Sequence, residues 1–170
     1  MPAPFPEAIN SPHLGPLRLH VHTTELPEGD PIINRVYRPA GPLPVPARGR
    51  VELLIWPPEA GIPDPAAFAA LIEQRWHAIT ATLDQTLLTA EPIVWEAVRG
   101  FSDPSVEGWP PDAATLLRTA RLEMIKISGE DDAADAIHEL QFNCIDYLGD
   151  HDLILNLRSN LTPLSAHFDG

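Results

Sequence analysis

Hydrophobic and polar residues alternate with a period of two in several short segments towards both ends of the chain. In PLRLHVHT (16–23), leucine and valine alternate with arginine and histidine. This is the pattern of a strand with one buried face. The same period predicts further strands over 32–38, 50–56, 121–128, 137–146, 153–159 and 163–170.

Between these segments, the apolar positions recur with the period of an α-helix. Asp64 is placed to cap a long helix, and Pro65 occupies the first helical position, where proline is favoured. We expect Pro92 to end or kink this helix. One apolar stripe along it is formed by Phe68, Leu71, Ile72, Trp76, Ile79, Leu83 and Leu87.

Two shorter segments, 92–100 and 112–120, predict two further helices, the second capped by Asp112. Strands, then helices, then strands with short connections predict an α+β fold. We expect one antiparallel sheet that ends in a C-terminal meander, with about three helices packed on one face. Residues 1–15 are rich in proline and predict a flexible arm, and residues 16–170 predict a single domain.

Charge narrows the classes of partner. The chain has 170 residues, with 11 lysines and arginines against 24 aspartates and glutamates, a formal net charge of −13. Affinity for phosphates comes from cationic contacts, so this balance argues against nucleic acids and anionic membranes as partners. An acidic surface would instead attract a basic partner.

Two further features bear on location. No apolar run approaches the roughly 20 residues of a membrane span, and the first residues lack the basic and apolar regions of a signal peptide. Cys144 is the only cysteine, which excludes an intramolecular disulfide. We therefore expect a soluble, cytoplasmic protein. Because Cys144 alternates with apolar residues, we expect a buried structural thiol.

His20 and His22 raise the question of a metal. A strand places residues i and i+2 on one face, so both imidazoles could reach one ion, with Glu25 as a third ligand. However, Arg18 shares that face, and a cation beside a metal is unfavourable. We therefore predict solvent-facing histidines without a metal or other cofactor. A small metal-binding protein or metal-dependent enzyme that uses this pair is the alternative.

Acidic residues are concentrated in two predicted turns, at 129–139 and 146–152, and neither has the spacing of an EF-hand. Solvated turns explain both, but they also suit docking of a basic partner. Trp109 lies beside Pro110 and is expected to be exposed, as tryptophans at interfaces often are. The predicted partner-binding residues are Glu130, Asp131, Asp132, Asp135, Asp150, Asp152 and Trp109.

Catalysis has little support in the sequence. There is no G-x-S-x-G motif, no P-loop and no G-x-G-x-x-G motif. We assign no catalytic residues, and the sequence favours a binding role over a catalytic one.

From residue 51 to the end, the order of elements resembles small bacterial domains of unknown function that accompany polymorphic toxin systems. The resemblance is carried by VELLIW, the long helix from Asp64, and LLRTARLEMIKIS, IHELQFNCIDYLGDHDLILNL and AHFDG. Those domains often have EHGL where this chain has GDHDL (149–153). Some of them are immunity proteins, and the resemblance implies no catalytic residues.

Three functions follow as expectations. The first is a non-catalytic acidic binding protein, such as an immunity protein that binds a basic toxin and blocks it. The second is the metal-binding alternative above. The third is a structural subunit of a larger assembly, with the proline-rich segments as docking elements.

Overall fold

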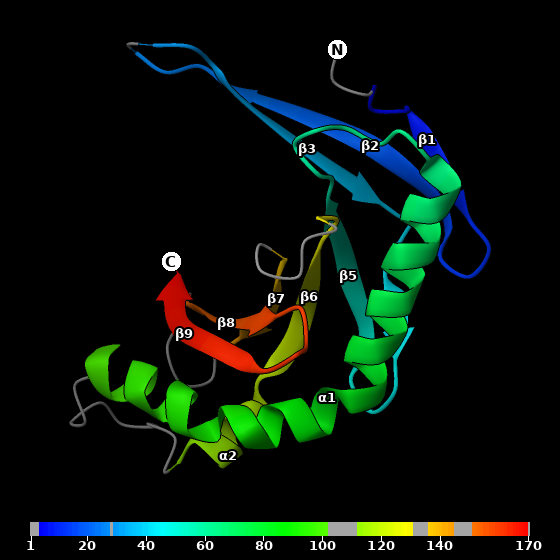
Figure 1. The fold of residues 1–170 in the computed structure, drawn as a ribbon. Coiled ribbons are helices and arrows are strands. Elements are labelled where there is room, and N and C mark those ends of the chain that lie inside the picture. The colour runs from blue at the N-terminus through cyan, green and yellow to red at the C-terminus, as the bar shows by residue number, and fades with distance from the viewer. Residues whose placement is uncertain (1–3, 28, 102–111, 131–135, 145–150, 170) are drawn as a thin grey trace.

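The structure is a computed structural model that describes residues 4–27, 29–101, 112–130, 136–144 and 151–169. Figure 1 shows a curved sheet with one long helix packed against it. The described elements are β1 (Ala8–Ser11), β2 (Gly15–Thr24), β3 (Ile32–Arg38), β4 (Leu43–Val45), β5 (Gly49–Trp56), α1 (Pro65–Phe101), α2 (Ala113–Thr119), β6 (Arg121–Ser128), β7 (Ile137–Asn143), β8 (Asp152–Arg158) and β9 (Pro163–Asp169).

The strands form one sheet of nine in the order β1-β2-β3-β5-β6-β7-β8-β9, with β4 paired to β5. The predicted α+β class and the C-terminal meander from β6 to β9 are confirmed. The expectation of a purely antiparallel sheet is wrong, because β5 and β6 are parallel. Both helices lie between β5 and β6 in the chain. They form the crossover connection that lets β6 run in the same direction as β5.

The helix α1 contacts both ends of the sheet. Strands β1 and β9 are the two terminal strands in the order, and both pack against α1. Figure 1 shows β1 beside one half of the helix and β9 beside the other. The bent helix therefore follows the sheet from one end to the other, and the apolar core lies between them. The buried stripe of the helix is formed by Phe68, Ala69, Ile72, Trp76, Ile79, Leu83, Leu87, Ala90, Val94 and Val98.

The start of α1 follows the prediction, and its length does not. The carboxylate of Asp64 accepts the N–H groups of Ala66 and Ala67, both at 3.0 Å, as an N-cap should. The helix continues through Pro92 to residue 101, so the two helices predicted for this segment are one. Proline removes the hydrogen bond to the carbonyl of Leu88, but this face is exposed and water can solvate that carbonyl.

Two proline-containing segments contribute strands that the sequence did not predict. Residues 8–11, within the segment expected to be a flexible arm, form β1, and Ile9 is buried. The hydroxyl of Ser11 and the backbone N–H of His13 donate to the carboxylate of Glu73 on α1. Burial opposes the charge of this carboxylate, but the two donors outweigh it and lower its pKa.

The short strand β4 lies in the proline-rich connection after β3 and pairs only with β5, outside the main strand order. Proline cannot donate to a strand ladder, so it is confined to such edges. Pro44 occupies this strand without interrupting the sheet.

Gly129 and His138 hold the end of β6 in place. Gly129 donates its N–H to the carbonyl of Trp56, and a Cβ at Gly129 would lie 2.6 Å from the Phe68 ring and 2.7 Å from that carbonyl. His138 is fully buried, and its Nδ1 accepts the N–H of Ser128 at 3.2 Å. Its Nε2 has no hydrogen-bond partner among the described residues. Burial, with a smaller contribution from Arg75, lowers the pKa of His138 to about 4.

We predict that Gly129→Ala lowers the free energy of unfolding by roughly 1–3 kcal/mol, because the added methyl group overpacks a filled site. Denaturant unfolding measures the change. Gly41→Ala is the matched control, since nothing lies within 4 Å of a Cβ there. Equal stability of the two variants would contradict the close packing at Gly129.

We also predict that stability falls as the pH drops from 6.5 towards 4. The unfolded state takes up a proton near pH 6.5, whereas folded His138 resists it down to about pH 4. The contribution is therefore complete above pH 6.5 and is lost by about pH 4, a difference of roughly 3 kcal/mol. Denaturant unfolding across this range measures it. His138→Gln should flatten the profile, while replacement of the exposed His167 by glutamine should leave it unchanged.

Candidate functional site

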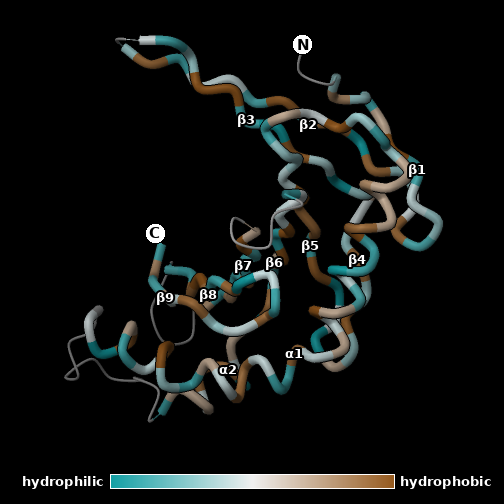
Figure 2. The backbone as a smooth tube through the Cα atoms, viewed as in Figure 1, coloured by the Kyte–Doolittle hydropathy of each residue, from teal (hydrophilic) through white to brown (hydrophobic). Residues whose placement is uncertain are grey.

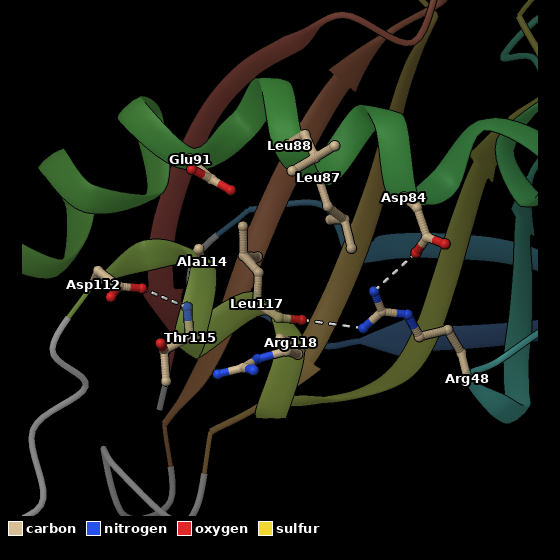
Figure 3. Close-up of a pocket in the computed structure, with 10 residues that line it drawn as sticks. All are labelled: Arg48, Asp84, Leu87, Leu88, Glu91, Asp112, Ala114, Thr115, Leu117 and Arg118. Carbon is tan, nitrogen blue, oxygen red and sulfur yellow. Dashed lines mark hydrogen bonds and ion pairs between the residues drawn. The ribbon is translucent and has the colours of Figure 1, made fainter.

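A cleft of about 490 Å³ opens between α1, α2 and the turn that joins β4 to β5. Figure 3 shows the side chains that line it. Its floor is apolar and includes Leu87 and Leu117, both buried. Leu88 stands at the rim with 60% of its surface exposed. The remaining lining residues are Arg48, Asp84, Glu91, Asp112, Ala114, Thr115 and Arg118.

Arg48 closes one end of the cleft. Its guanidinium donates to the carbonyl of Leu117 and to the carboxylate of Asp84, each at 3.1 Å. It reaches them from a tight turn in which Ala47 and Gly49 have positive φ angles of 59° and 83°. That conformation is unfavourable for alanine by about 1–2 kcal/mol. The turn therefore holds Arg48 where it joins α1 to α2.

Carboxylates flank the opposite end, where Figure 3 shows Glu91 and Asp112. The N–H of Thr115 donates to Asp112 at 2.7 Å and, together with the nearby Arg118, lowers the pKa of this carboxyl. Asp112 is therefore ionised at neutral pH. Glu91 is half-buried and makes no ion pair with a residue in the described part of the chain.

This arrangement suits a basic side chain of another molecule. The leucine floor can cover the aliphatic stem of a lysine or arginine. Glu91 can accept its charged end, since Asp84 is already paired with Arg48.

The predicted acidic site is divided by the fold. Glu130 follows β6, and its carboxylate accepts the N–H of Glu59 at 3.1 Å. Asp152 begins β8, and its carboxylate accepts the amide of Gln141 at 2.6 Å. The two residues lie at opposite ends of the meander, about 20 Å apart for a strand of this length. Asp131, Asp132, Asp135, Asp150 and Trp109 lie outside the described residues.

The histidine pair lies on an exposed strand. His20 and His22 share one face of β2, as predicted, and both are exposed, as is Glu25. Among the described residues, no group of three or more histidine, cysteine, aspartate or glutamate side chains could hold a metal. Cys144 is buried, and burial raises the pKa of its thiol to about 11.

The cleft was not found from the sequence. Its residues come from three separate segments, and only their packing brings them together. One local signal existed: Leu88 lies off the predicted apolar stripe, and an exposed leucine three residues before an acidic residue is a candidate for contact with a partner.

Comparisons of the chain with protein families, curated proteins and solved structures find no match. The resemblance to toxin-associated domains therefore stays a prediction. No helix in the described part of the chain has the length and apolar character needed to cross a membrane.

We predict that Arg48→Met lowers the free energy of unfolding by roughly 1–3 kcal/mol, because the carbonyl of Leu117 loses its charged donor. Methionine keeps most of the aliphatic contact. Arg99→Met removes an exposed pair with Glu96 and should cost less than about 0.5 kcal/mol. Thermal and denaturant unfolding test both variants, and an equal effect would show that Arg48 is only a surface residue.

Proposed function

We propose that this chain is a non-catalytic binding protein whose cleft between α1 and α2 receives a basic side chain of a protein partner. The observation that carries the proposal is Glu91, a half-buried carboxylate without an ion-pair partner among the described residues, beside a leucine floor. A cationic side chain would supply the missing countercharge and cover Leu88.

The charge of the whole chain supports the same class of partner. A net charge of −13 accelerates encounter with a basic protein and disfavours acidic ones. Inhibition of a basic toxin by an immunity protein has this electrostatic character. We therefore propose a basic toxin as the partner, with occlusion of its active site as the mode of action.

The two described residues of the predicted acidic site, Glu130 and Asp152, do not line the cleft. Asp152 is half-buried and already bonded to Gln141, and Glu130 is bonded to Glu59. Neither carboxylate is free in the way that Glu91 is. For this reason the proposal places the central contact in the cleft.

Capture from a lysate of the source cell identifies the partner, and calorimetry with the purified partner then tests the site. We predict that Glu91→Gln raises the Kd about tenfold, the effect of losing one charge-assisted contact. Glu96→Gln removes the same charge from the same helix outside the cleft and should change the Kd by less than about twofold.

Three results would contradict the proposal: a partner whose affinity is insensitive to salt, equal effects of the two variants, or a partner with an acidic surface. If the captured partner is an enzyme, inhibition at an equimolar ratio supports the immunity function. Unchanged activity at saturation would remove that function and leave only the binding role.

A further inference from the structure

The far parts of β2 and β3 form a two-stranded ribbon beyond the rest of the sheet. We define the ribbon as residues 20–24 and 32–36 with the described residues 25–27 and 29–31 that follow and precede them. Its strands pair with each other from His20 and Val36 to Thr24 and Ile32. The neighbouring strands pair with β2 only as far as Arg18 and with β3 only at Tyr37. Both outer edges of the ribbon are thus unpaired within the described chain, and Figure 1 shows it projecting away from α1.

The ribbon is unusually apolar for an exposed element. Four of the seven large hydrophobic residues that are exposed in the described part of the chain lie in it: Val21, Leu26, Ile32 and Ile33. Figure 2 shows these hydrophobic positions along the projecting strands. A lone two-stranded ribbon is marginal in water, and free strand edges favour pairing with another chain. Both properties indicate that another molecule covers the ribbon.

Charge is divided between the base and the tip of the ribbon, and the cation between them, Arg35, lies over the ring of Phe5. Next to the ribbon, at the point that we call its base, Arg18 and Arg38 lie directly opposite each other, and neither makes an ion pair with a described residue. Like charges in this position repel unless an anion offsets them. The strands β2 and β3 contain no acidic residue, whereas Glu25 and Asp30 lie in the loop at the tip. Base and tip are about 20 Å apart, from the length of the strands.

We propose that two copies of this chain associate through their β2–β3 ribbons, laid side by side and antiparallel about a twofold axis. This arrangement sets the acidic tip of each copy beside the cationic base of the other, so the ribbon is complementary to itself. It pairs one free strand edge of each copy and places the exposed valine, leucine and isoleucine side chains of the two ribbons next to one another. The contact lies on a different part of the molecule from the cleft, so it does not depend on the proposed function.

Sedimentation velocity over a wide range of concentration, at low and high salt, tests the proposal by charge exchange. The base-reversed variant, Arg18→Glu with Arg38→Glu, should weaken the dimer at least about tenfold, because base and tip would then both be acidic. The tip-reversed variant, Glu25→Lys with Asp30→Lys, should do the same. Combining all four substitutions restores complementarity and should restore the dimer.

Arg121→Glu is the control, since Arg121 is an exposed cation at the start of β6, outside the ribbon, and should leave the dimer intact. Far-UV circular dichroism checks that each variant keeps its secondary structure. A wild-type chain that stays monomeric would overturn the proposal. A dimer that persists in both reversed variants would also overturn it. So would a failure of the variant with all four substitutions to dimerise again. A monomer that binds a duplex DNA probe through Arg18 and Arg38 would overturn it in favour of nucleic acid.

Discussion

The packing of one continuous helix against both terminal strands of the sheet determines the rest of the structure. The helix α1 contacts β1 and β9, which stand at opposite ends of the strand order, and Figure 1 shows the bent helix following the curved sheet. The curved face and the stripe of α1 together bury the core, including Leu17, Ile55 and Leu155. A helix that ended at Pro92 would lose the buried contacts of Val94 and Val98. The burial of those two side chains outweighs the hydrogen bond that Pro92 removes.

This packing also decides where polar chemistry can occur. The interior contains few polar side chains in the described chain, and its one buried histidine is held neutral by burial. The candidate functional sites are therefore on the surface. One is the cleft where α2 and the β4–β5 turn meet α1. The other is the ribbon, where β2 and β3 extend beyond the strands that pair with them. Both sites are formed by elements that extend beyond the packed interface between α1 and the sheet.

Local pattern predicted most of the elements but not how they combine. Alternation placed β3 and β6 at their observed limits, and the caps at Asp64 and Asp112 are confirmed. The short strands β1 and β4 were not predicted, because proline-rich segments were read as connections. Proline is nevertheless tolerated in strands at the edge of a sheet. The parallel pairing of β5 with β6 and the cleft both arise from long-range packing, which no local period encodes. The prediction that His20 and His22 share one strand face is confirmed. The projection of that strand was not predictable, because it depends on where pairing with β1 and β5 ends.

The distribution of charge connects the two proposed surfaces. A chain with 24 acidic and 11 basic residues would be expected to place its cations where they offset carboxylates. Arg48 does this by joining Asp84 to the last turn of α2, and Lys126 does it by pairing with Glu139 at 2.8 Å. Arg18 and Arg38 instead face each other on an exposed strand pair. Two cations directly opposite each other on paired strands repel, which is unfavourable for the isolated molecule unless an anion offsets them. An acidic segment of another copy, as proposed for the ribbon, would supply the anion that this pair lacks.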